Sequence, residues 1–265
     1  LTCRGNQLTG IDLSNNLVLE EFYCSSNLLS SLDLSNNQML TNINCGGNSL
    51  VGLDVSNNTS LIELNCINSD LTSLDLSQNL ALNVLYCMDN QLSSLALPQG
   101  GVVYCSRNQL TELSLSNSPF LTELYCTDNV LTQIDVPGAT SLTILDAKDN
   151  QLSRLDVSSA TALNYFVCSG NQLGCLNVRN GNNINMNINA TSNSNLTCIE
   201  VDDQGWATSN WTAANGSIDF QTSFNEDCNN VCSIAFGQKT YVPDDNFETY
   251  LESNSMGDGI TNNDS

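Results

Sequence analysis

Cysteine recurs at a fixed interval along most of the chain. The positions are Cys3, Cys24, Cys45, Cys66 and Cys87, each 21 residues apart, then Cys105 after 18 residues, Cys126 after 21 and Cys168 after twice 21, with Ala147 at the skipped position. A repeat of constant length indicates one structural unit stacked along an axis, in which each unit contacts only its neighbours. The interval therefore restricts the chain to a repeat architecture.

Each repeat has the frame Leu-x-x-Leu-x-Cys-x-x-Asn-x-Leu, followed by x-x-Leu-Asp-Leu-Ser, and one unit runs from Leu61 to Ser77. The Leu-x-Cys and Leu-Asp-Leu segments alternate apolar and polar residues with period two, which predicts two short strands with their apolar side chains inward. One coil cannot bury those side chains, whereas stacked coils bury them as columns. The sequence therefore predicts a solenoid of about nine coils plus caps, made mostly of short parallel strands and turns with little helix.

Two polar or weakly polar columns follow from the same register. The cysteines Cys24, Cys45, Cys66, Cys87, Cys105 and Cys126 occupy a leucine position, so we expect small, buried, unbridged side chains. Asparagines stand three residues after the cysteines, at Asn27, Asn48, Asn90, Asn108 and Asn129 among others, and Ser69 takes that place once. Their amides are expected to satisfy backbone groups of the turn as a ladder. No Cys-x-x-Cys pair supports a zinc or iron–sulfur site.

These motifs resemble the leucine-rich-repeat family over residues 1–180. The 21-residue form with a cysteine in one leucine position is similar to the surface variety common in Bacteroidetes, which is often exported by type IX secretion. The resemblance implies a secreted or outer-surface bacterial protein that binds a ligand or adheres. It names no ligand, because a fold alone does not.

The repeat decays after Val178, and this change sets the expected domain boundaries. We expect the solenoid at 1–180, irregular coils and a C-terminal cap at 181–230, a linker at 231–240, and the start of the N-terminal cap of a further array at 241–265. A longer modular chain is therefore expected. Four late cysteines in an extracellular protein suggest disulfides. We favour Cys198–Cys228 across the tryptophan segment and leave Cys175 and Cys232 open.

The composition of the chain limits the classes of partner and activity that it can have. The chain has 28 acidic and six basic residues, no histidine, and a formal charge of −22, so nucleic acid and anionic lipid are poor partners. The chain contains no apolar stretch of about 18 residues, so the sequence predicts no membrane-spanning helix. No nucleophile–base pair and no metal constellation point to catalysis, so we expect no enzyme and no cofactor.

Two outward rows are candidate sites. Tyr86, Tyr104 and Tyr125 precede cysteines of successive coils and should stack on one face, edged by Glu123; such a row is either a binding patch for a protein or glycan or ordinary strand packing. A second row contains Asp33, Asp54 and Asp75. Hydrogen bonds from the following serines, or calcium ions, would offset the repulsion within that row.

Two function classes are consistent with these features. One is a binding or adhesion module that uses the strand face and contacts a protein or glycan outside the cell, beside further domains of the same polypeptide. The other is a rigid spacer in a larger surface protein. The shortened repeat at Ala96–Gly101 makes a local prediction: a tightened turn on the aspartate side and unbroken strand pairing on the cysteine side.

Overall fold

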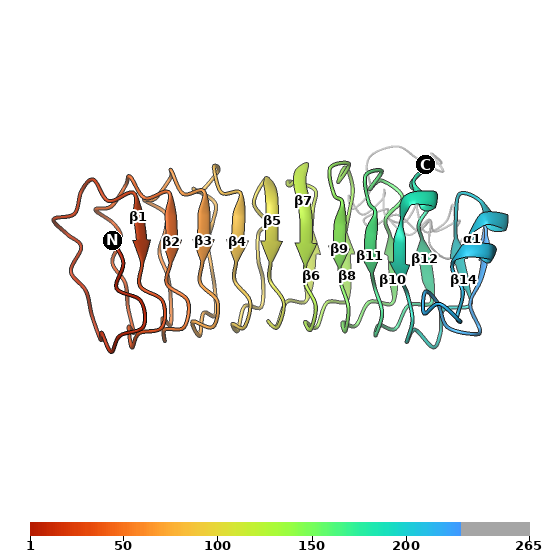
Figure 1. Ribbon diagram of the computed structural model, residues 1–265, viewed down its shortest axis with the longest axis horizontal. Coiled ribbons are helices and arrows are strands. Elements are labelled where there is room, and N and C mark those ends of the chain that lie inside the picture. Colours follow the sequence, from red (N-terminus) through yellow and green to blue (C-terminus); the bar gives the residue numbers. More distant parts are fainter. Residues whose placement is uncertain (229–265) are drawn as a thin grey trace, which may run out of the picture. The chain divides into compact units, whose positions relative to one another are not determined.

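The structure is a computed structural model that describes residues 1–228. The expected linker at 231–240, the expected second cap at 241–265 and Cys232 lie outside the described residues. The described part is a single stack of coils, which Figure 1 shows as a row of near-identical turns with the strands side by side. The described residues contain no helix that could span a membrane.

The strand before each cysteine contributes to one parallel sheet of nine strands, in the order β1-β2-β3-β4-β5-β7-β9-β11-β13. Its members are β1 (Glu21–Tyr23), β2 (Asn42–Asn44), β3 (Glu63–Asn65), β4 (Val84–Tyr86), β5 (Gly100–Tyr104), β7 (Phe120–Tyr125), β9 (Ile144–Asp146), β11 (Tyr165–Val167) and β13 (Asn187–Asn189). Each strand pairs with the next at an equivalent position, for example Leu64 with Leu85. The chain is thus a leucine-rich-repeat β-solenoid with little helix, as predicted.

The interior consists of apolar columns that run along the stack. In the β3 coil, Leu61, Leu64, Cys66 and Leu71 are each fully buried. Burial of one leucine side chain contributes about 1.5–3 kcal/mol relative to exposure. Because each coil supplies the same positions, the columns form one continuous core.

The cysteine column is buried and unbridged. Cys24, Cys45, Cys66, Cys87, Cys105, Cys126 and Cys168 are buried free thiols. Burial raises the pKa of Cys66 and of Cys105 to about 12, because the thiolate would lose its solvation. The Cys66 thiol lies 3.5 Å from the carbonyl oxygen of Tyr86 on the next coil, to which it donates a weak hydrogen bond. The column therefore acts as apolar packing with no reactive thiolate at neutral pH.

The expected asparagine ladder links neighbouring coils. Asn129 donates from Nδ2 to the carbonyl oxygens of Cys105 and Cys126, both at 3.1 Å, and its Oδ1 accepts the backbone N–H of Leu110 at 3.0 Å. Asn27, Asn48, Asn90 and Asn108 make the same pattern and are buried. Each amide thus satisfies backbone groups that would otherwise be buried without partners.

A second asparagine ladder, which the cysteine spacing does not reveal, lies in the turns after the Leu-Asp-Leu segments of the first coils. Its members are Asn37, Asn58 and Asn79, which are 21 residues apart and buried. Asn58 donates from Nδ2 to the carbonyl oxygens of Leu34 at 3.2 Å and Asn37 at 2.9 Å. The Oδ1 atoms of all three make no hydrogen bond. The side chains of this ladder therefore donate hydrogen bonds to the neighbouring coils but accept none.

The Leu-Asp-Leu segments correct one expectation. They alternate as predicted, with Leu53 and Val55 buried and Asp54 exposed, but the segments at Asp12, Asp33, Asp54 and Asp75 form no strands. There the second asparagine ladder, not the backbone, connects the coils. In the later coils, from Glu112 onward, the corresponding segments do pair as strands. These are β6 (Glu112–Ser114) with β8 (Gln133–Asp135), and β10 (Arg154–Asp156) with β12 (Cys175–Asn177), β14 (Cys198–Glu200) and β15 (Ser223–Asn225).

The shortened repeat leaves the main sheet intact, which confirms the prediction of unbroken pairing. Val84, Leu85 and Tyr86 pair with Val102, Val103 and Tyr104. The missing residues come from the turn that carries the second asparagine ladder, so that ladder has no member between Asn79 and Ser118. The chain re-enters the sheet through Gly101, which has a φ of +80° and precedes a register shift against β7.

The last coils form the cap. A short 3-10 helix η1 (Asn183–Asn185) precedes β13, and α1 (Gln204–Asn210) follows β14. Asp203 caps α1 by accepting the backbone N–H of Trp206 at 2.9 Å. The structure joins Cys198 to Cys228, the pairing that the sequence favours, with their Cα atoms 6.0 Å apart. Cys175 is also disulfide-bonded.

Candidate functional site

The outward face of the nine-stranded sheet carries two side-chain rows, because each three-residue strand turns its middle residue inward. The row beside the cysteines is Tyr23, Asn44, Asn65, Tyr86, Tyr104, Tyr125, Asp146, Val167 and Asn189, and the parallel row is Glu21, Asn42, Glu63, Val84, Val102, Glu123, Ile144, Tyr165 and Asn187. The solenoid thus presents a regular strip whose chemistry changes along its length.

The three consecutive tyrosines stack at the centre of this strip. The ring centroids of Tyr86 and Tyr104 are 5.0 Å apart with planes at 10°, and those of Tyr104 and Tyr125 are 4.5 Å apart with planes at 3°. All three side chains are partly exposed. We call Tyr86, Tyr104 and Tyr125 the tyrosine row. The register of the coils holds the rings at one strand spacing, which is also a favourable stacking distance.

Hydrogen bonds and packing fix the edge of the row. The Tyr125 hydroxyl donates to Oε2 of Glu123 at 2.9 Å. Partial burial, and next the bond to Glu123, raise the pKa of Tyr125 above its usual value. Burial, and next the charge of Glu63, also raise the pKa of Tyr86. Tyr86 and Tyr125 therefore remain neutral phenols at physiological pH, with Glu123 beside Tyr125 as the sequence predicts.

Apolar side chains extend the patch on both sides. Val84 and Val102 lie in the parallel row next to Tyr86 and Tyr104, and both are partly exposed. On the other side, the residue after each cysteine is the next outward position, and there Ile67 and Met88 are partly exposed. The tyrosine spacing alone does not mark Ile67 or Met88, although the period-two alternation of the same strands does.

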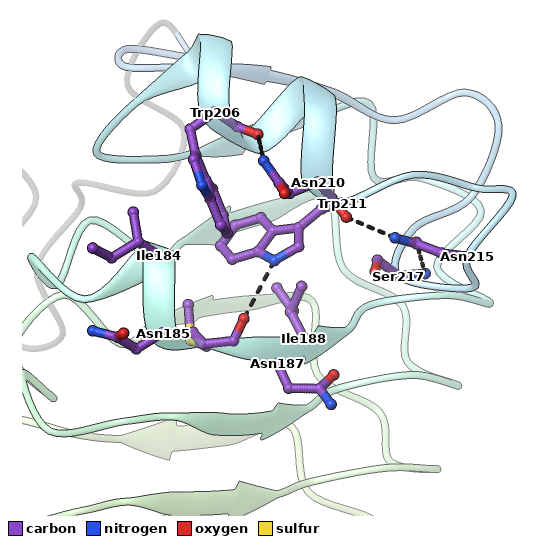
Figure 2. Close-up of a pocket in the computed structure, with 10 residues that line it drawn as sticks. Ile184, Asn185, Asn187, Ile188, Trp206, Asn210, Trp211, Asn215 and Ser217 are labelled. Carbon is purple, nitrogen blue, oxygen red and sulfur yellow. Dashed lines mark hydrogen bonds between the residues drawn. The ribbon is translucent and has the colours of Figure 1, made fainter.

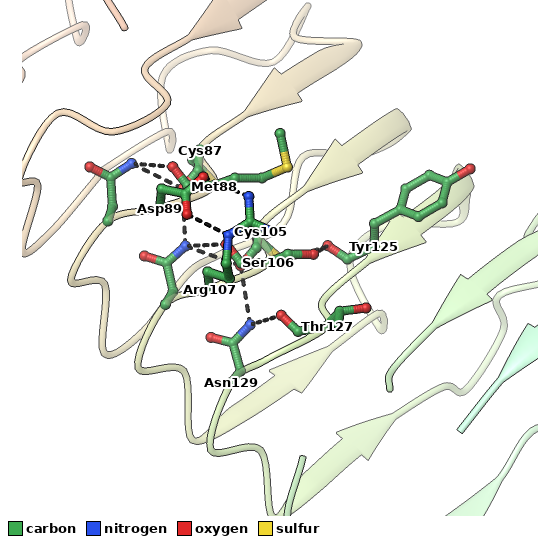
Figure 3. Close-up of polar contacts among 11 residues, drawn as sticks. Cys87, Met88, Asp89, Cys105, Ser106, Arg107, Tyr125, Thr127 and Asn129 are labelled. Carbon is green, nitrogen blue, oxygen red and sulfur yellow. Dashed lines mark hydrogen bonds and ion pairs between the residues drawn. The ribbon is translucent and has the colours of Figure 1, made fainter. Parts of the chain in front are cut away.

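A charged border surrounds this patch. The strip carries Glu21, Glu63, Glu123 and Asp146, and its first tyrosine, Tyr23, lies under the Arg4 guanidinium, 4.4 Å from the ring centroid. Farther from the strip, Arg107 forms a bidentate ion pair with Asp89 on the preceding coil, and this pair lowers the pKa of Asp89. Figure 3 shows this pair beside Asn129 of the asparagine ladder. Both residues of the pair have positive φ.

The aspartates Asp33, Asp54 and Asp75 lie away from this patch, and each accepts hydrogen bonds from the serine two residues later. Asp33 Oδ1 accepts the hydroxyl of Ser35 at 2.7 Å and its backbone N–H at 3.0 Å, and these bonds lower the pKa of Asp33. Asp54 and Asp75 likewise accept from Ser56 and Ser77, and their pKa values are lowered as well. In residues 1–228 no three acidic or cysteine side chains gather as a metal site. Calcium on this row stays an untested alternative to the hydrogen-bonded ladder.

The comparisons with known proteins agree with this architecture. No protein-family model matches the chain, and no curated protein matches it. Among solved structures, the functional domain of InlJ from Listeria monocytogenes, described as including a cysteine ladder, is 34% identical with a TM-score of 0.62 and covers 77% of this chain. A leucine-rich-repeat protein of Leptospira interrogans is 22% identical over 68% of the chain with a TM-score of 0.60.

YopM from Yersinia enterocolitica is 25% identical over 69% of the chain with a TM-score of 0.53. The chain spans 44% of the length of the InlJ structure, 50% of the Leptospira structure and 37% of the YopM structure. The similarity to InlJ includes the feature that organises this sequence, the cysteine ladder. The chain is therefore a leucine-rich-repeat solenoid that resembles bacterial proteins of this fold.

Proposed function

We propose that the chain is a binding module that contacts a protein through the outward face of its nine-stranded sheet, with the tyrosine row at the centre of the contact. The observation that carries the proposal is the stack of three phenol rings at 5.0 and 4.5 Å, flanked by Val84 and Val102. Solenoids of this kind offer extended surfaces suited to large partners.

The tyrosine row is suited to binding because it is ordered before a partner arrives. Each ring is held by its neighbour and by the strand register, so little side-chain entropy remains to be lost on association. Tyrosine is also enriched among the residues that dominate interface energies. The Tyr104 side chain is hydrogen-bonded to Tyr125, whereas the Tyr86 hydroxyl makes no hydrogen bond within residues 1–228 and is available to a partner.

The charge around the row selects among partners. Glu63, Glu123 and Asp146 border it, and the chain carries a net charge of −22. Like charges across an interface are repulsive, so the face favours neutral or cationic partner surfaces and rejects anionic ones. A glycan is the alternative ligand for the same rings. The spacer alternative is less favoured, because a spacer has no need for an aromatic patch on a polar strip.

We further propose that the module works outside the bacterial cell, secreted or displayed on the outer surface. The Cys198–Cys228 disulfide supports this placement, because such bonds persist in oxidising compartments. The free cysteines from Cys24 to Cys168 are compatible with it, because burial keeps their thiols from oxidants. Type IX export from a Bacteroidetes cell remains a proposal that rests on the resemblance of the repeat alone.

The test is an array of purified extracellular proteins probed with the labelled chain and two variants. Tyr104→Ala removes the middle ring of the row, whereas Tyr23→Ala removes a ring of the same strip that contacts Arg4 and no other tyrosine. We expect partners whose affinity falls by more than about 1 kcal/mol, roughly fivefold, in Tyr104→Ala and is unchanged in Tyr23→Ala. If every partner bound the unmodified chain and both variants equally, the tyrosine row would not be the contact, and the spacer alternative would be favoured instead.

A further inference from the structure

A shallow hollow in the cap is separate from the tyrosine row. Its volume is about 400 Å³, and it lies between α1 and the segment from η1 to β13. Figure 2 shows Trp206 standing across Trp211, with Ile184 on the other side of the Trp206 ring. The two ring centroids are 5.4 Å apart with planes at 86°. The volume is within the range of small-ligand pockets.

The two tryptophans have different roles in this hollow. Trp211 is buried, packs at 5.9 Å from Phe224 and donates from Nε1 to the carbonyl oxygen of Met186 at 3.3 Å, so it belongs to the cap core. Trp206 is partly exposed, and its indole N–H donates to no acceptor in residues 1–228. Packing of the cap accounts for Trp211 but leaves Trp206 partly exposed and its indole N–H without an acceptor in residues 1–228.

The polar lining is neutral and largely uncommitted. Ten residues line the hollow, four of them asparagines, and none of the ten is charged, in a chain whose net charge is −22. The Asn187 amide and the Ser217 hydroxyl make no hydrogen bond in the described part of the chain. Asn185 and Asn210 each use only Nδ2, toward Asn182 Oδ1 and Trp206 O. Free donors and free acceptors are therefore both present.

We infer that this hollow binds a neutral saccharide. The C–H face of a pyranose ring packs on an exposed indole, and sugar hydroxyls, which both donate and accept, match amides and a hydroxyl that offer both functions. The absence of charge from the lining removes the means to recognise an ionic ligand. Trp206 is the stacking platform, and Asn187 and Asn210 are the groups that orient the sugar.

Tryptophan fluorescence reads this hollow alone, because Trp206 and Trp211 are the only two tryptophans in the chain. The probes are three neutral trisaccharides: triacetylchitotriose, cellotriose and maltotriose. We expect at least one to change the emission of the full chain saturably. No saturable change with any of the three up to roughly 10 mM, ten times the Kd of a weak 1 mM complex, overturns the proposal.

Variants then locate the binding. Asn187→Ala removes an exposed amide without an internal partner, so it leaves folding unchanged and should weaken the trisaccharide at least fivefold. Trp206→Ala, read by ligand-observed NMR, should abolish binding, while Trp206→Phe should restore part of it. Phe220→Ala, at an aromatic residue of the same cap that is 95% exposed and outside the lining, is the matched control and should bind normally. Unchanged affinity in both Asn187→Ala and Trp206→Ala would place any binding elsewhere and contradict the inference.

Discussion

Replacing Gly101 with alanine is expected to lower the free energy of unfolding by about 3–5 kcal/mol, because two costs add at this position. The backbone there has a φ of +80°, which L-residues rarely adopt. A Cβ atom at Gly101 would also lie 1.8 Å from the carbonyl oxygen of Asn83. That oxygen accepts the N–H of Val102 at 2.8 Å, so it cannot move without breaking the strand pairing that carries Tyr104. Denaturant unfolding measures the change.

Substitutions at two other glycines distinguish the cost of the positive φ from the cost of the close contact. Gly138 has a φ of +71° with no atom within 4 Å of its would-be Cβ, so Gly138→Ala should cost only about 1–2 kcal/mol, the conformational part. Gly52 has neither a positive φ nor a close neighbour, and Gly52→Ala should change stability by less than about 0.5 kcal/mol. If Gly101→Ala and Gly138→Ala lowered the free energy of unfolding by the same amount, the close contact between Gly101 and the Asn83 carbonyl would be contradicted.

Replacing Asn129 with alanine should destabilise the chain by about 2–4 kcal/mol. The substitution removes the acceptor for the buried N–H of Leu110 and a donor to the carbonyl oxygens of Cys105 and Cys126. The two carbonyls keep a second donor, from Asn108 and Asn150 respectively. The N–H of Leu110 keeps none, and an orphaned buried donor costs about 1–3 kcal/mol beyond the lost bonds.

The matched control lies in the second ladder. Asn79→Ala also removes a buried amide, but Oδ1 of Asn79 is unpaired, so no backbone N–H is orphaned. The carbonyls that Asn79 contacts, of Val55 and Asn58, also accept from the backbone N–H groups of Asn58 and Leu61. We expect a cost of about 1 kcal/mol or less. Equal costs at Asn129 and Asn79 in thermal or denaturant unfolding would contradict the distinction between the two ladders.

The sequence predicts the parts of this molecule that depend on register alone. A 21-residue period fixes which side chains share a column, so the buried cysteines, the first asparagine ladder and the stacking of Tyr86, Tyr104 and Tyr125 all follow from it. Asn37, Asn58 and Asn79 recur with the same period and give a second ladder that the same reasoning could have found.

Features that depend on the distance between backbones could not be predicted in this way. Leu53-Asp54-Val55 and Leu113-Ser114-Leu115 alternate identically, yet only the second segment includes strand residues; near the first, the asparagine side chain of Asn58 makes the hydrogen bond to the preceding coil. The hollow beside Trp206 depends on how α1 folds over β13, and no spacing in the sequence encodes that contact.

Site-specific photocrosslinking tests the central claim, that the outward face of the nine-stranded sheet is the contact surface. A benzophenone amino acid replaces either Val102, on β5 beside the tyrosine row, or Glu112, which is exposed on β6 in the separate two-stranded sheet. Irradiation with a partner from the protein array should give a crosslinked product from the Val102 position and none from the Glu112 position. A product from Glu112 alone, or equal products from both positions, would contradict the account.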